Sequence, residues 1–181
     1  MIIASQKKKE NIAEYLLYMW QIEDIIRAYG LDIDQIQKHI INSYDLPEEQ
    51  KKSMREWYES LIDMMHSEGV EKKGHLQLNK NVLIDLTDLH LRLLKSTREP
   101  FYGAAFFKTL PYIVELRAKS GEGKTGELET CFNALYGVLL LRLQKKEIQS
   151  DTLKAIPQIS TFLSILAEKY KQEKAGELEL E

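Results

Sequence analysis

Apolar residues recur with a helical period along nearly the whole chain, and no segment shows the sustained alternation of a strand. The broadest apolar face belongs to residues 10–30, where it covers about half of the helix circumference. We predict one helix from near Ser5 to Gly30, because glycine suits the left-handed residue that often ends a helix. Such a face can contact several helices at once, and its residues are Ile12, Tyr15, Leu16, Tyr18, Met19, Ile22, Ile25, Ile26 and Tyr29.

Turn residues divide the remaining helical pattern into shorter segments. We predict helices over about 32–42, from Pro47 to the turn at Gly69, and over about 75–95, 101–119, 127–147 and 150–174. Pro111 is expected to kink one of them, and Pro157 can bend the last. The pattern therefore predicts an all-α fold: a single-domain bundle of about six or seven helices over residues 1–176, followed by an acidic tail at 177–181.

Charge and composition exclude several classes of partner. A net charge of −3 among 181 residues offers no electrostatic basis for binding nucleic acid or an anionic membrane. No apolar run approaches the ~18 residues that span a bilayer, and the N-terminus lacks the order of a secretory signal. A single cysteine, Cys131, excludes an intrachain disulfide. We expect a cytoplasmic protein that binds neither nucleic acid nor membrane.

Motifs that carry chemistry are incomplete. Gly123-Lys124-Thr125 matches the end of a phosphate-binding loop, but Ala118 stands where that loop needs its first glycine. The histidines fall on separate elements, so we expect no metal and no cofactor. Cys131 falls on an apolar helix side, where a buried thiol is commoner than a reactive one. No catalytic residue can be named, and a non-enzymatic role is favoured although enzymatic activity stays open.

Three polar residues fall on or at the edge of apolar helix faces: Glu23, His90 and Arg142. Buried charges need partners, so we predict that these residues meet between the helices over 10–30, 75–95 and 127–147. Two interpretations remain open. The residues form purely structural hydrogen bonds, or they line a pocket for a small polar or anionic ligand.

Leu17 and Trp20 lie on the otherwise polar side of the first helix. Exposed together, they would form an apolar patch of the kind that marks interfaces. We predict a homodimer that uses this face or the edge formed by Tyr15 and Tyr18. The alternative is that the second helix or the C-terminal helix covers Leu17 and Trp20.

Two segments carry a resemblance to a known family: ENIAEYLLYMWQIEDIIR at residues 10–27, and ETCFNALYG at 129–137 followed by LLRLQKKEI at 140–148. The chain resembles a family of bacterial helical proteins known as a domain of unknown function. This resemblance implies an all-helical fold and a bacterial source, and it carries no activity and no catalytic residue. From the residues, we expect a self-associating interaction or scaffold module. The alternative is a ligand-binding bundle, either enzymatic or not.

Overall fold

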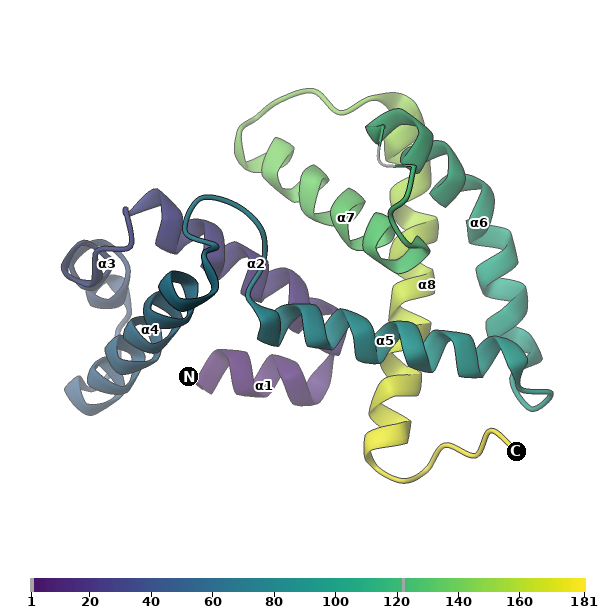
Figure 1. The fold of residues 1–181 in the computed structure, drawn as a ribbon, viewed down its shortest axis with the longest axis horizontal. Coiled ribbons are helices and arrows are strands. Elements are labelled where there is room, and N and C mark those ends of the chain that lie inside the picture. The colour runs from purple at the N-terminus through teal and green to yellow at the C-terminus, as the bar shows by residue number, and fades with distance from the viewer. Residues whose placement is uncertain (1, 122) are drawn as a thin grey trace. The chain divides into compact units, whose positions relative to one another are not determined.

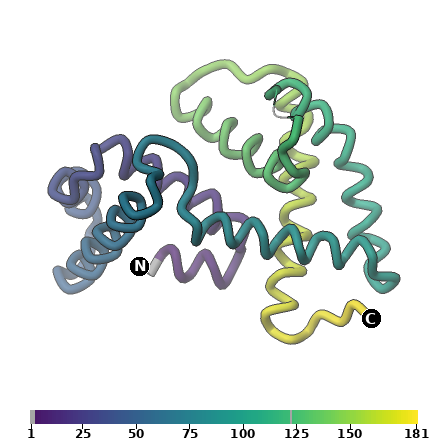
Figure 2. Tube along the Cα trace, in the orientation of Figure 1, coloured from purple at the N-terminus to yellow at the C-terminus, as the bar shows by residue number. Residues whose placement is uncertain are grey.

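Helices form all the regular secondary structure in residues 2–121 and 123–181, the part of the chain that this computed structural model describes (Figures 1 and 2). The all-α prediction is confirmed. The elements are α1 (Ile2–Glu10), α2 (Ile12–Ala28), α3 (Ile33–His39), the 3₁₀ turn η1 (Ile41–Ser43), α4 (Glu48–Glu68), α5 (Gln77–Lys95), α6 (Pro100–Ser120), α7 (Glu127–Leu143) and α8 (Ser150–Lys174). The described residues thus form eight α-helices, and the expected six or seven was too few.

The additional helix arises from a break at Asn11 within the segment predicted as one helix. The Oδ1 atom of Asn11 accepts a hydrogen bond from the backbone N–H of Ala13 at 3.0 Å. A side chain that captures a backbone donor two residues ahead acts as a helix N-cap, so α2 begins anew after α1 ends. The apolar period alone does not show this break, because the pattern continues on both sides of it.

Other helix ends follow local signals in the sequence. Asp32 caps α3 by accepting from the N–H groups of Asp34 and Gln35. Gly69 ends α4 with φ of 67°, in the left-handed region that glycine enters without steric cost. Pro100 occupies the first turn of α6, and Pro111 lies inside that helix, which continues to Ser120. In the loop that follows α6, Glu122 lies outside the described residues.

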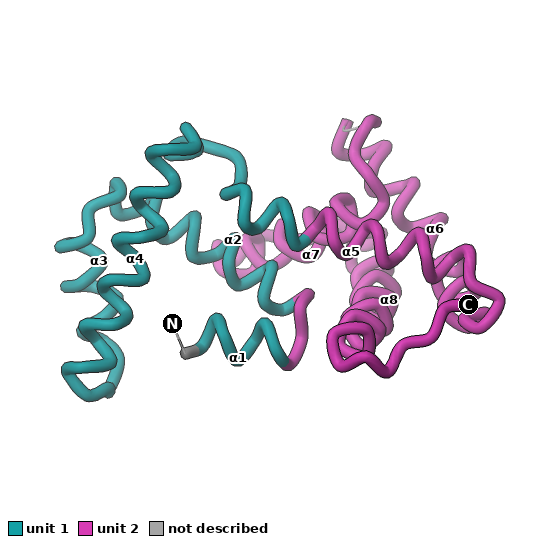
Figure 3. The backbone as a smooth tube through the Cα atoms, turned by 60° about the horizontal axis from the view of Figure 1, so that its bottom comes forward, with its two compact units in different colours: residues 1–9, 14–82 teal, residues 10–13, 83–181 magenta. Residues whose placement is uncertain are grey.

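The chain divides into two compact units, shown in different colours in Figure 3. Unit 1 comprises residues 1–9 and 14–82, and unit 2 comprises residues 10–13 and 83–181. A single domain over residues 1–176 stays a prediction. No helix in the described ranges is long and apolar enough to cross a membrane.

Unit 1 contains most of α1 and α2 together with α3, η1, α4 and the start of α5. The turn η1 contacts both α3 and α4, and these two helices contact each other. The Tyr29 ring stacks on His39, with centroids 5.7 Å apart, and so joins the end of α2 to α3. Fully buried side chains of this unit include Leu16, Met19, Ile26, Ile36, Ile41, Tyr58, Met65 and Leu76.

Unit 2 is built from α6, α7 and α8, each of which packs against the other two, together with most of α5 (Figure 1). Aromatic rings dominate part of its core: the Phe162 ring lies 5.6 Å from Phe106 and 5.7 Å from Tyr102, measured between centroids. Cys131 is fully buried, as the sequence predicted. Burial raises the pKa of its thiol to about 12, with a further contribution from Glu127.

Candidate functional site

The carboxylate of Glu23 is fully buried in unit 1 and contacts three polar groups. Its Oε1 accepts from the N–H of Leu76 at 2.9 Å and from Nδ2 of Asn79 at 2.6 Å. Its Oε2 lies 2.6 Å from Nδ1 of His75. All three partners come from the segment that begins α5, so a side chain of α2 holds the start of a helix about fifty residues later in the chain.

This arrangement has a clear structural role as a helix cap supplied from another helix. The first turn of α5 leaves backbone N–H groups without intrahelical acceptors, and Glu23 satisfies that of Leu76. Glu68 satisfies the next one, because its Oε2 accepts from the N–H of Gln77 at 2.6 Å. Both acids also lie at the positive end of the helix dipole, where a carboxylate is stabilised.

A second side chain of α2 fixes the loop that connects α4 to α5. Arg27 donates from Nη2 to the carbonyl oxygens of Val70 and Gly74, at 3.0 and 2.5 Å. Its Nη1 pairs with Asp24 at 2.9 Å. One guanidinium can reach both carbonyl oxygens because it supplies several donors in a rigid fork. Arg27 therefore holds the loop itself, while Glu23 holds the start of α5 that follows it.

His75 lies between this buried network and solvent. Its ring stacks on Trp20 with centroids 4.2 Å apart and an interplanar angle of 13°. With 32% of its side chain exposed, the ring covers Trp20 on one side and contacts Glu23 through Nδ1. In the described residues, Oδ1 of Asn79 has no hydrogen-bond partner although Asn79 is fully buried.

His90 occupies a separate polar position, in unit 2. It is 3% exposed, and its Nδ1 lies 2.6 Å from the hydroxyl oxygen of Tyr102. Its ring also packs edge-on against Phe106, at 4.6 Å between centroids. Burial lowers the pKa of His90, which a nearby Glu127 opposes only in part. Burial likewise raises the pKa of Tyr102, so a neutral imidazole faces a protonated phenol.

The three polar residues singled out in the sequence differ in their surroundings. Glu23 and His90 are buried and each takes its hydrogen-bond partners from its own unit. Arg142 is exposed, so the expectation that it lies in a core was wrong. It occupies the last turn of α7, one residue before the helix ends at Leu143. The hydrogen bonds of Glu23 are explained by a structural role. Its partners are His75, Leu76 and Asn79, which the sequence did not single out.

The interface residues expected on α2 are largely covered. Trp20 is 3% exposed beneath His75, and Tyr15 is also buried, so these two offer almost no exposed surface. Leu17 and Tyr18 are half-buried. Burial, with Tyr44 nearby, raises the pKa of Tyr18 to about 12.

An apolar surface is present instead on α6. Six exposed apolar residues follow one face of this helix with spacings of three and four: Phe101, Ala104, Phe107, Pro111, Val114 and Ala118. We call them the α6 stripe. Phe101 is 88% exposed, Phe107 65% and Val114 53%. The opposite face of α6 carries the buried residues Tyr102, Phe106, Thr109 and Ile113. The helix is thus apolar on both sides, and only one of them is packed.

Charged side chains border the α6 stripe along one edge. Lys108 and Glu115 are both exposed and lie seven residues apart, which places them on the same side of the helix. Glu115 also pairs with Lys119, at 2.9 Å. Among the described residues, no group of three His, Cys, Asp or Glu side chains is placed to hold a metal ion.

Comparison with known families matches residues 1–177 to the family described as Domain of unknown function (DUF4924). The chain belongs to this family. No curated protein and no solved structure matches the chain. Membership in DUF4924 confirms the resemblance drawn from residues 10–27 and 129–148, and it assigns no activity.

Proposed function

We propose that this protein is a self-associating helical interaction module, and that two copies pair through the α6 stripe. The single observation that carries the proposal is the run of exposed apolar residues on α6, centred on Phe107 and Val114. Isolated exposed apolar residues are common on folded proteins, whereas a contiguous row along one helix face marks a site of association.

The area of the stripe supports a modest interface. At about 200 Å² per phenylalanine side chain, Phe101 and Phe107 together present roughly 300 Å² of apolar surface. A standard interface buries about 800 Å² on each partner, so these two rings supply more than a third of that area before their neighbours are counted. We expect a dissociation constant in the range of roughly 10–100 μM.

The spacing of the stripe supports a second helix as the occupant. Steps of three and four residues keep a row of side chains along one seam, as in helix pairs that pack by knobs into holes. Near the start of α6, Gly103 has no side chain and Ala104 has only a methyl group, so a partner can approach closely there.

The charges at the edge of the stripe support a second copy of this chain in antiparallel orientation. In such a pair, the two-fold axis brings the same edge of both helices together. A residue before the axis in one copy then faces the residue at the same distance after the axis in the other copy. With the axis beside Pro111 and Tyr112, Lys108 of one copy faces Glu115 of the other, and the pair occurs twice. A parallel arrangement offers no such match at this edge.

The location that we propose is the cytoplasm. The lone cysteine of the chain is buried and its thiol stays protonated, so no disulfide is required for the fold. Such cysteine usage is typical of a reducing compartment.

Light scattering across a concentration series tests the pairing. Phe107→Glu should weaken dimerisation at least about tenfold, because a charge replaces an apolar side chain at the centre of the seam. Ile84→Glu is the matched control, since Ile84 is 59% exposed on α5 and lies outside the stripe. Equal weakening by both variants, or a monomer at high micromolar concentration in the unchanged protein, would contradict the proposal.

A further inference from the structure

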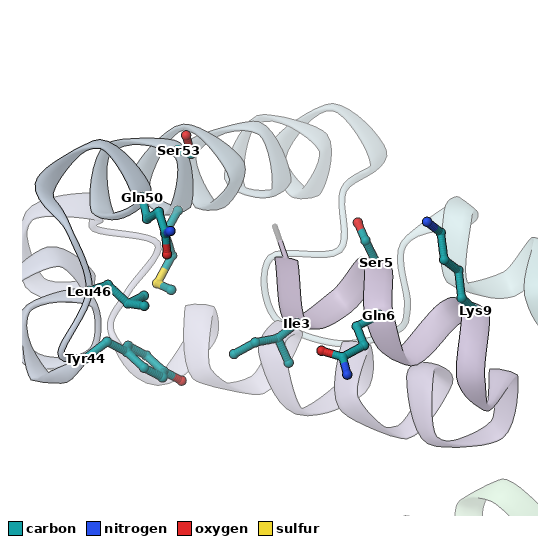
Figure 4. Close-up of a pocket in the computed structure, with 9 residues that line it drawn as sticks. Ile3, Ser5, Gln6, Lys9, Tyr44, Leu46, Gln50 and Ser53 are labelled. Atoms are coloured by element: carbon teal, nitrogen blue, oxygen red, sulfur yellow. The ribbon is translucent and has the colours of Figure 1, made fainter.

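Unit 1 contains a cavity of about 710 Å³ between α1 and the segment that leads from Tyr44 into α4 (Figure 4). Pockets for small molecules commonly measure about 300–1,000 Å³, so this cavity has sufficient volume for one. In Figure 4 the Ile3 side chain and the Tyr44 hydroxyl point toward one another across it. The cavity lies wholly within unit 1 and is separate from the α6 stripe.

The lining has an apolar region and a charged end. Ile3, Leu46 and Met54 supply aliphatic and thioether surface to the lining. In Figure 4, Leu46 lies beside Tyr44, and Ile3 lies across the cavity from them on α1. Lys9 is the one charged residue among the described residues of the lining, and no acid lines the cavity. Lys9 projects from the far end of α1. It lies six residues after Ile3, which is about 9 Å along the helix at 1.5 Å per residue. Lys9 forms no ion pair with any described residue.

We propose that unit 1 binds a small amphipathic anion, with an aliphatic chain between Ile3, Leu46 and Met54 and a carboxylate near Lys9. The apolar surface favours a chain, because burial of each CH₂ group removes it from water. The lone cation favours a negative head group, because it attracts an anion and repels a cation. The length between Ile3 and Lys9 fits a chain of medium length.

Isothermal titration with decanoate, below its micelle concentration, tests this site on the full-length protein. We expect binding of one decanoate per chain, and octanoate should bind about tenfold more weakly because it lacks two CH₂ groups. Decyltrimethylammonium has the same chain length with the opposite charge and should bind more weakly than decanoate. No saturable binding of decanoate, or equal affinity for the cationic probe, overturns the proposal.

Two variants locate the site. Leu46→Trp fills part of the apolar region and should weaken decanoate binding at least tenfold, while Lys9→Gln should weaken it about three- to fivefold, as expected for an exposed ion pair. Lys8→Gln is the matched control, because Lys8 is also exposed on α1 but its Nζ lies over the Tyr15 ring, 5.4 Å from the centroid. Melting temperatures check that Leu46→Trp is folded. If that variant is unfolded, Lys9→Gln alone decides whether decanoate binds in this cavity.

Binding that is unchanged in Lys9→Gln and in a folded Leu46→Trp variant overturns the assignment to this cavity. The result is independent of self-association, because Phe107→Glu lies outside unit 1 and should bind decanoate with unchanged affinity. Loss of decanoate binding in that variant would contradict the independence of the two sites.

Discussion

The Glu23 carboxylate lies 2.6 Å from Nδ1 of His75, and its other oxygen receives the N–H of Leu76 and the amide of Asn79. A fully buried acid in α2 thereby caps the start of α5. Because hydrogen bonds to a charged acceptor are stronger than neutral ones, this contact contributes more to stability than the ion pairs at the surface of unit 1.

Glu23→Gln should lower the free energy of unfolding by about 2–3 kcal/mol, since the buried network loses its charge and one acceptor becomes a donor. Urea denaturation at neutral pH measures this change. Glu48→Gln is the control, because Glu48 is 91% exposed and lies 3.4 Å from Lys51, and it should cost less than about 1 kcal/mol. Similar losses in the two variants would contradict the capping role.

Arg27→Met should loosen the loop between α4 and α5. The substitution removes the donors that reach Val70 and Gly74 but keeps most of the aliphatic stem. We expect faster amide hydrogen exchange in the loop and the first turn of α5, with a loss of about 1.5–3 kcal/mol in stability. Exchange rates in α8, which lies in unit 2, serve as the internal reference. Unchanged exchange in residues 70–77 would show that Arg27 does not hold the loop.

His90 should make unit 2 less stable in mild acid. Its pKa in the folded protein is lowered from 6.5, so the unfolded chain binds a proton more readily than the folded one. The contribution to stability is present above pH 6.5 and is lost as the pH falls from 6.5 toward the lowered value, by at most about 1.4 kcal/mol per pH unit. His90→Gln keeps a polar group near Tyr102 without this titration.

Unfolding of the unchanged protein and of His90→Gln should therefore be compared at several pH values between 7.5 and 4.5. The other three histidines are the same in both proteins, so the difference between the two curves isolates His90. A difference that does not change with pH would be inconsistent with a lowered pKa.

The Cys131 thiol should resist modification in the folded protein. It is fully buried, and its pKa of about 12 leaves almost no thiolate at neutral pH. Reaction with Ellman's reagent should be very slow in buffer and complete within minutes in denaturant. Rapid labelling under native conditions would contradict the packing of α7.

The sequence was most informative where one local pattern determines structure. The helical period predicted the all-α fold, and Gly69 and Asp32 act at helix ends as their residue types suggest. Glu23 and His90 proved buried because each lies on or at the edge of an apolar arc that faces a core. The partners of Glu23 could not be predicted, because they depend on which loop folds back against α2.

Surfaces were harder to predict than cores, for a physical reason. Trp20 lies on a polar helix side yet is covered by the His75 ring, a contact between residues far apart in the chain. On α6, both Phe106 and Phe107 are apolar, and only the packing of the unit decides that Phe106 is buried and Phe107 exposed. Arg142 follows the apolar period at the end of α7, yet it is exposed.

The antiparallel pairing through α6 is tested most directly by exchanging the charges of Lys108 and Glu115. Sedimentation equilibrium at low ionic strength measures the dimerisation of each variant. Lys108→Glu and Glu115→Lys should each weaken dimerisation about three- to tenfold, because each places like charges opposite one another twice in the dimer. The double variant Lys108→Glu/Glu115→Lys should regain most of the affinity of the unchanged protein. A double variant as weak as the sum of the two single changes, or single variants with unaltered dimerisation, would contradict the account.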